Sequence, residues 1–188
     1  MRMSFRFAGA AAALVALSLP AAAQVFVIGN GLGSDCYSKT ARNVSNFIDA
    51  ETTCTRALRE ESMNRENRAK TYTNRGVLRM RAGRYDQALG DYSEAIRLRP
   101  ELGEAYLNQG AAYIYKDEFG TALQSLNKAI ELETNDMFAA YYNRGIAKEN
   151  TGDVEGAYYD FKKSLELKPE WSLAQRQLTR FTLTPTNG

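Results

Sequence analysis

Among its 188 residues the sequence has no histidine, only two cysteines and only four prolines. The absence of histidine excludes Ser/His/Asp and Cys/His nucleophile arrangements and histidine-based metal sites. The two cysteines, Cys36 and Cys54, do not form a Cys-x-x-Cys motif, which argues against a redox-active pair. Carboxylates are plentiful, but no convergent pair can be identified among them. We therefore expect a protein that is not an enzyme, with no catalytic residues, no metal and no cofactor.

A strong excess of charge of one sign is also missing, because 24 basic residues stand against 22 acidic ones. This balance argues against nucleic acid as a partner. The charge is nevertheless unevenly spread: residues 56–100 carry a net +5 and residues 101–160 a net −7. Such a gradient could steer a charged partner or favour head-to-tail stacking, and solvated outer faces are the alternative interpretation.

No hydrophobic run is long enough for a membrane span, since the apolar stretch of residues 7–19 has only thirteen residues. Arg2 and Arg6 precede this stretch, and the small residues at 21–23 follow it. This order is typical of a signal peptide at 1–23, cleaved before Gln24. An uncleaved N-terminal anchor is the competing interpretation. We expect export to the periplasm, with no stable membrane insertion after cleavage.

The chain repeats itself with a period near 34 residues. Gly76, Gly110 and Gly145 are 34 and 35 residues apart, and other positions follow the same steps. These are Tyr72, Tyr106 and Tyr141; Ala88, Ala122 and Ala157; Tyr92, Leu126 and Phe161; and Ala95, Ala129 and Ser164. A period of this length with alternating small and aromatic residues indicates stacked helix–turn–helix units.

Each unit reads as two amphipathic helices, at 67–81 and 85–98 in the first unit. Gly83 between them suits a left-handed C-cap, and Asp153 suits the N-cap of the last repeated helix. Asp117 stands where the other units have glycine, so a different cap is expected there. Because glycine inside a helix costs about 1 kcal/mol, Gly76 and its equivalents predict a close approach to the small Ala88 and its equivalents.

These residues resemble the tetratricopeptide repeat (TPR) family, whose period they share. The resemblance implies an all-α TPR solenoid of three consecutive helix–turn–helix repeats, with an N-terminal helical hairpin and a C-terminal capping helix. The expected repeats are 69–102, 103–137 and 138–169. A capping helix is expected at 170–181, with Trp171, Ala174 and Leu178 on one face, and a flexible tail at 182–188. The leucine that the family places before its glycine is Arg75, Gln109 and Arg144 here.

The region before the repeats matches the pattern less well. Residues 24–34 are expected to be a flexible mature N-terminus, and residues 35–68 a degenerate helical hairpin with a charged connection. A chain reversal near Ser45 would bring Cys36 opposite Cys54, and an oxidising periplasm favours a disulfide over two unpaired thiols. The run of glycines at 29–33 imitates a dinucleotide-binding fingerprint but has the wrong spacing and no surrounding βαβ unit.

Three asparagines share one register, each two residues before a repeat glycine. In the family this helix lines the concave face, and an asparagine ladder at this place holds the backbone of an extended peptide in several members. The alternative is that these asparagines bond neighbouring repeats and persist as family consensus. The predicted peptide-binding residues are Asn74, Asn108, Asn143, Val77, Met80, Leu107, Ala111, Ile114, Tyr115, Tyr142 and Ile146.

The resemblance implies a non-catalytic protein–protein interaction module, and we expect an exported adaptor that binds a protein or peptide in its concave groove. Some TPR domains grip a peptide's C-terminal carboxylate with a Lys/Asn clamp. Thr73 before the first asparagine and Val77 after the first glycine depart from that clamp, so this ligand class is not expected. The alternative function is a self-associating solenoid that forms a structural subunit of an envelope complex.

Overall fold

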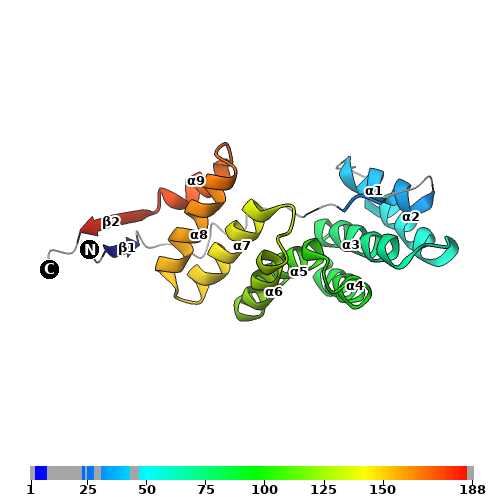
Figure 1. Cartoon of the computed structure of the whole chain (residues 1–188), viewed down its shortest axis with the longest axis horizontal. Coiled ribbons are helices and arrows are strands. Elements are labelled where there is room, and N and C mark those ends of the chain that lie inside the picture. Colours follow the sequence, from blue (N-terminus) through cyan, green and yellow to red (C-terminus); the bar gives the residue numbers. More distant parts are fainter. Residues whose placement is uncertain (1–2, 8–22, 24, 28–30, 43–46, 186–188) are drawn as a thin grey trace.

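The repeats fold into a row of helical hairpins that follow one another along the long axis of the molecule (Figure 1). The computed structural model describes residues 3–7, 23, 25–27, 31–42 and 47–185. Within this part of the chain the helices are α1 (Leu32–Ala41), α2 (Phe47–Glu60), α3 (Arg65–Arg81), α4 (Tyr85–Leu98), α5 (Gly103–Tyr115), α6 (Phe119–Glu131), α7 (Met137–Asn150), α8 (Val154–Leu167) and α9 (Ser172–Leu178). The strands are β1 (Met3–Phe7) and β2 (Phe181–Pro185). The predicted all-α solenoid is confirmed, with three repeats formed by α3 to α8.

The core of each repeat is a large side chain set against a glycine. Tyr92, Leu126 and Phe161 are fully buried on the second helix of their repeats. A Cβ added at Gly110 would lie 2.5 Å from Leu126 Cγ, and one at Gly145 would lie 2.7 Å from the Phe161 ring. The expected close approach to the small alanine is seen in the second repeat, where the Ala122 carbonyl oxygen would lie 3.3 Å from that Cβ, but the large residue four positions later is the nearest neighbour in every repeat. The glycines make room for the large residue, which fills the space that a side chain on the first helix would take.

The turns inside the repeats share one cap. Gly83 and Gly152 have φ of 71° and 92°, as the cap prediction requires. Asp117 adopts the same left-handed conformation, with φ of 57°. Its N–H donates to Ile114 O at 3.0 Å, as the N–H of Gly83 donates to Met80 O at 2.9 Å. The expectation of a different cap in the second repeat is therefore wrong, because aspartate tolerates this region better than most side chains.

A polar bridge joins the two helices of each repeat. The guanidinium of Arg75 donates two hydrogen bonds, of 2.7 and 3.3 Å, to Asp91 Oδ1, and Arg144 donates to the equivalent Asp160 at 2.8 Å. In the middle repeat Ser125 Oγ donates to Gln109 Oε1 at 2.9 Å. These bridges explain the departure from the family's leucine. A leucine would pack there, whereas this chain pairs a charged or amide side chain across the hairpin.

The N-terminal hairpin packs against the first repeat. In the structure Cys36 of α1 and Cys54 of α2 are joined by a disulfide with a Cα–Cα distance of 4.7 Å. Glu51 of α2 accepts from Arg79 and Arg84 of the first repeat. Burial would raise the pKa of the Glu51 carboxyl, but hydrogen bonds from these two arginines hold it below its usual value. The hairpin is thus tied to the first repeat by charge as well as by apolar contact.

The two ends of the described chain meet at the far end of the solenoid. β1 pairs antiparallel with β2, Met3 opposite Pro185 and Phe7 opposite Phe181. A sheet was not expected, nor was structure at 3–7, inside the predicted signal peptide, or at 182–185, in the predicted tail. Pairing satisfies backbone groups that two separate extended segments would leave to solvent. The rings of Phe181 and Tyr158, 5.6 Å apart, connect β2 to α8.

The predicted capping helix is confirmed, although α9 is shorter than expected. Trp171 and Ala174 are buried, and the Trp171 ring stacks on Tyr142 with centroids 5.5 Å apart. Trp171 also meets the edge of Phe138, at 4.1 Å. These contacts close the apolar surface that the last repeat would otherwise expose.

Candidate peptide-binding site

The three register asparagines lie on α3, α5 and α7, the first helices of the repeats. Helix α5 packs against both α3 and α7, so these helices form one row. Asn74, Asn108 and Asn143 are each fully buried. We call the side of this row that carries them the asparagine face. A buried carboxamide loses its hydration, so each one requires protein partners for its donor and its acceptor.

Two of the asparagines bind the backbone of an extended segment near the N-terminus. Asn74 Oδ1 accepts from the N–H of Val25 at 3.1 Å, and its Nδ2 donates to the Val25 carbonyl at 2.8 Å. Asn108 holds Ala23 in the same way, at 2.9 and 2.8 Å. Each carboxamide therefore satisfies both polar groups of one residue, as a neighbouring strand would. This arrangement reads the backbone and not the identity of the side chain.

The paired residues define a register and a direction. Ala23 and Val25 are two residues apart, while the asparagines that bind them are one repeat apart. One repeat therefore corresponds to two residues of the bound segment. Ala23 lies at the second repeat and Val25 at the first, so the segment runs opposite to the order of the repeats.

Side chains of this segment alternate between buried and exposed. Ala23, Val25 and Val27 are 1, 6 and 3% exposed, whereas Phe26 is 59% exposed. This is the period of two that an extended chain shows on a surface. The exposed Phe26 ring meets the edge of Tyr37 on α1, with centroids 5.1 Å apart. Residues 24–34 were expected to be flexible, but the described residues of this stretch pair and pack instead.

The inward side chains enter two separate apolar clusters. Ala23 belongs to the cluster that includes Leu107, Ile114, Tyr142 and Ile146. Val25 belongs to the cluster of Ala69, Ala95, Leu102 and Ala105, with Tyr72 packed against it. The sequence reasoning had selected the residues of the first cluster but missed those of the second. The alternation of Ala23, Val25 and Val27 was the signal that could have identified the segment as a strand-like occupant.

Asn143 differs from its two equivalents. Its side chain is fully buried, yet neither Nδ2 nor Oδ1 has a hydrogen-bond partner. A buried unsatisfied carboxamide costs about 1–3 kcal/mol. The register of the other two pairs would place the next residue of a bound segment, two positions toward its N-terminus, at Asn143. The third position of the ladder therefore has the chemistry of the other two without their bonds.

The remaining predicted site residues are buried or packed among other side chains of the repeats. Met80 and Ala111 belong to a buried cluster with Tyr92, and Tyr115 packs against that cluster. The Tyr115 ring stacks on Tyr85, with centroids 5.0 Å apart, and burial raises the pKa of its hydroxyl. Val77 is fully buried. These four residues pack helices together in the structure, and no contact of theirs with the extended segment is described.

Charged groups stand toward the ends of the helix row. Arg81, on α3, donates from Nη1 to the carbonyl of Thr40 at 2.7 Å, and burial lowers the pKa of its guanidinium. Glu149, on α7, is paired with Arg180; burial nevertheless raises the pKa of its carboxyl. The asparagines between them are neutral, which suits a neutral peptide backbone.

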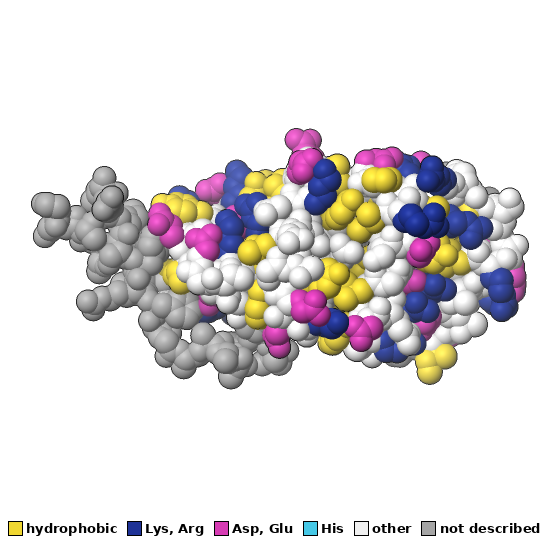
Figure 2. Space-filling view, turned by 90° about the horizontal axis from the view of Figure 1, so that it is seen from below, with side chains coloured by type: hydrophobic (Ala, Val, Ile, Leu, Met, Phe, Trp, Pro, Cys, Tyr) yellow, Lys and Arg dark blue, Asp and Glu magenta, His cyan; other side chains and the backbone are white. Residues whose placement is uncertain are grey.

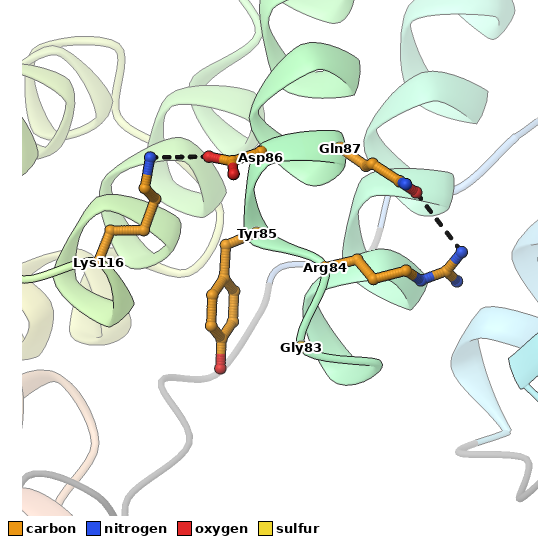
Figure 3. Close-up of a pocket in the computed structure, with 6 residues that line it drawn as sticks. All are labelled: Gly83, Arg84, Tyr85, Asp86, Gln87 and Lys116. Atoms are coloured by element: carbon orange, nitrogen blue, oxygen red, sulfur yellow. Dashed lines mark hydrogen bonds and ion pairs between the residues drawn. The ribbon is translucent and has the colours of Figure 1, made fainter.

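The outer surface carries the uneven charge seen in the sequence. In Figure 2 the Lys and Arg side chains gather mainly over the end that holds α1 to α4. A shallow pocket of about 250 Å³ lies there, at the start of α4, lined by Gly83, Arg84, Tyr85, Asp86, Gln87 and Lys116 (Figure 3). Its polar groups pair with one another: Lys116 Nζ donates to Asp86 at 2.7 Å, and Arg84 to Gln87 at 3.5 Å. This pocket therefore has less to offer a ligand than the asparagine face.

The described residues show neither a metal site nor a membrane-spanning helix. Within them, no three His, Cys, Asp or Glu side chains are grouped so that they could hold a metal ion. None of the described helices is both long and apolar enough to cross a membrane.

Comparison with known families identifies the repeats. Models of the tetratricopeptide repeat match residues 69–102, 103–136 and 138–170, which is more than half of the chain. The chain therefore belongs to the tetratricopeptide repeat family. This fold is generally a non-catalytic interaction module.

Individual proteins show what the chain is similar to. A mouse FK506-binding protein-like protein is 32% identical over 131 residues; the match covers 65% of this chain and 38% of that protein. The chain thus spans well under half of this relative. The structure titled first TPR of Spaghetti (RPAP3) bound to HSP90 peptide SRMEEVD has a TM-score of 0.58 and 26% identity, covering 61% of this chain and 90% of the other. The crystal structure of MamA has a TM-score of 0.65 at 23% identity, covering 80 and 82%, and shows the shared fold.

Proposed function

We propose that this protein is an exported, non-catalytic adaptor that binds an extended peptide, or an extended segment of a protein, along its asparagine face. One observation carries the proposal: Asn74 and Asn108 each hold both backbone groups of one residue of an extended segment. A surface that does this for one segment has the chemistry to do so for another. Two-point recognition of backbone is how an added strand gains affinity, while pockets for alternate side chains provide selectivity.

The related repeats support a peptide or protein as the partner, since the RPAP3 domain was determined with an HSP90 peptide. That peptide, SRMEEVD, is acidic, whereas this chain presents no cation at the two positions where a carboxylate clamp was sought. Thr73 is buried and donates to the Ala69 carbonyl at 3.1 Å, and Val77 is buried and apolar. We therefore propose a neutral, backbone-bound segment as the ligand rather than a terminal carboxylate.

The decisive experiment replaces Asn74, Asn108 and Asn143 together by alanine in the full chain. Partners are captured from a periplasmic extract with the parent and the triple variant, and bound proteins are identified by mass spectrometry. We expect the partners of the parent to be lost from the triple variant while its helical circular dichroism is retained. Asn127→Ala, on the outer helix α6, is the matched control and should retain them. Equal capture by the parent and the folded triple variant would refute the proposal.

The localisation is a separate part of the proposal and has its own test. Cell fractionation followed by N-terminal sequencing should find a periplasmic chain that begins at Gln24. A cytoplasmic chain with an intact N-terminus would contradict export. Export also supports the disulfide, because an oxidising compartment maintains the Cys36–Cys54 bond seen in the structure.

Self-association is the second candidate function, favoured by the uneven charge of the two halves of the repeat region. A solenoid with a basic and an acidic end can stack end to end, and the contact would weaken with salt. Light scattering over a range of protein and salt concentrations tests this idea. A mass that stays at one protomer throughout would exclude it.

A further inference from the structure

The segment on the asparagine face belongs to the protein itself. Ala23 and Val25 lie outside the repeats, before α1, and bind asparagines that are 85 and 49 residues further along the chain, respectively. Their contacts combine bidentate backbone bonds with burial of every second side chain. This is how a bound peptide would lie, so the chain carries an occupant for its own binding site.

We propose that Ala23 and residues 25–27 act as an internal pseudo-ligand that covers the asparagine face, and that the external ligand it resembles is an extended peptide with small or β-branched residues at alternate positions. This inference rests on the proposed function and adds two points: the class of the ligand, and an internal segment that competes with it for the asparagine face. The ligand runs opposite to the repeats, two residues per repeat, with an alanine-sized side chain at Asn108 and a valine-sized one at Asn74. An external peptide must displace the segment before it can use these two asparagines.

The three asparagines differ in their hydrogen bonds, and this difference supports the proposal. The described segment satisfies Asn74 and Asn108 but leaves the buried carboxamide of Asn143 without a partner. A buried Asn143 side chain without hydrogen bonds is explained if a longer ligand supplies a third residue whose backbone binds it.

Cleavage of the proposed signal peptide would directly change how the asparagine face is covered. Cleavage before Gln24 removes Ala23, the residue that Asn108 binds, and leaves Val25, the residue that Asn74 binds. Processing would therefore free Asn108 beside the unpartnered Asn143. The unprocessed chain would be the more strongly covered form, and the exported chain the more receptive one.

The first experiment measures the internal contact in the full chain. Amide hydrogen exchange followed by NMR should show slow exchange for the N–H groups of Ala23 and Val25 and fast exchange for that of Phe26. Asn108→Ala should accelerate exchange at Ala23 and Asn74→Ala at Val25. Exchange of both amides at the rate of an unfolded chain, with protected solenoid helices, would overturn the proposal. Protection that grows with protein concentration would also overturn it, because a second copy would then be the occupant.

The second experiment measures competition by binding of a fluorescent peptide with the sequence AAAQVFV, residues 21–27 of this chain. A full-chain variant with Ala23→Pro and Val25→Pro lacks the two N–H groups that donate to Asn108 and Asn74. If the segment competes with the peptide within the same molecule, this variant should bind the peptide roughly tenfold more tightly than the parent or better. Phe26→Pro introduces the same rigid residue at an outward position and removes only the ring contact with Tyr37, so its gain in peptide affinity should be far smaller than that of the double variant. Circular dichroism checks that both variants keep the solenoid.

The outcomes separate this inference from the proposed function. Equal binding by the parent and the double variant would overturn the internal competitor and leave the peptide-binding face intact. No binding by either would overturn the proposed ligand class, while the proposed function would still be judged by partner capture with the triple asparagine variant. Tight binding that survives Asn74→Ala with Asn108→Ala in the double-variant background would overturn the assigned site.

Discussion

Replacing Asn143 by leucine should stabilise the protein, whereas the same change at Asn108 should destabilise it. Both side chains are fully buried at equivalent positions of two repeats, so helix position and burial are matched. They differ in their bonds, because Asn108 makes two hydrogen bonds with Ala23 and Asn143 makes none. Leucine has a similar size and carries no polar group that requires a partner.

The magnitudes follow from that difference. At Asn143 the change removes an unsatisfied carboxamide and improves helix propensity by about 0.5 kcal/mol, so the free energy of unfolding should rise by about 1–2 kcal/mol. At Asn108 the change loses two bonds and leaves the buried N–H and C=O of Ala23 unpaired, so the free energy of unfolding should fall by about 1–3 kcal/mol. For a chain of this size 1 kcal/mol corresponds to about 2–4 °C in Tm.

Urea unfolding of the full-length variants, followed by helical circular dichroism, measures both changes. Gln124→Leu on the exposed side of α6 is the control for a surface amide-to-leucine change and should change stability by less than about 0.5 kcal/mol. The reasoning would be refuted if Asn143→Leu lost as much stability as Asn108→Leu. That result would mean that the Asn143 carboxamide is satisfied in solution, and the third position of the ladder would then not be vacant for a ligand.

Four further substitutions test the fold. In thermal melts, Asp117→Gly should raise the free energy of unfolding by about 0.5–1 kcal/mol, because its φ of 57° suits glycine, and Gly152→Ala should lower it by at least that much. Asp91→Ala should cost about 3 kcal/mol in urea titrations, because it leaves Arg75 with an unpaired, largely buried charge, and a cost under 1 kcal/mol would contradict a structural role for the bridge. Cys54→Ala should lower stability by about 3 kcal/mol under non-reducing conditions and by far less with reductant present, and equal losses in both would show that the bond does not form.

The solenoid could be read from the sequence because its information is local and repeated. A period near 34 residues, the apolar stripe of residues such as Ala88 and Tyr92, and the turn at Gly83 specify helices and caps within one repeat. Three copies of the pattern then require neighbours, since one hairpin cannot bury its apolar face alone. The capping role of Trp171 followed from the same reasoning, because the last repeat needs a cover.

Other features depended on contacts that no local pattern records. The nearest neighbour of each repeat glycine depends on packing in three dimensions, so Leu126 and its equivalents lie closer to the glycines than the alanines that the sequence suggested. Asp117 adopted the left-handed cap because the turn requires it, despite the side chain. The pairing of β1 with β2 joins the two ends of the chain, a separation over which sequence periodicity carries no information.

The register of Asn74, Asn108 and Asn143 was visible in the sequence, and so was its suitability for peptide backbone. The sequence could not show which backbone the asparagines bind, since hydrogen bonds between groups 49 and 85 residues apart leave no spacing to read. Only the folded chain brings Ala23 and Val25 onto the helices and leaves the Asn143 carboxamide unpaired. Local periodicity thus determined the scaffold, and long-range packing decided what lies on its binding face.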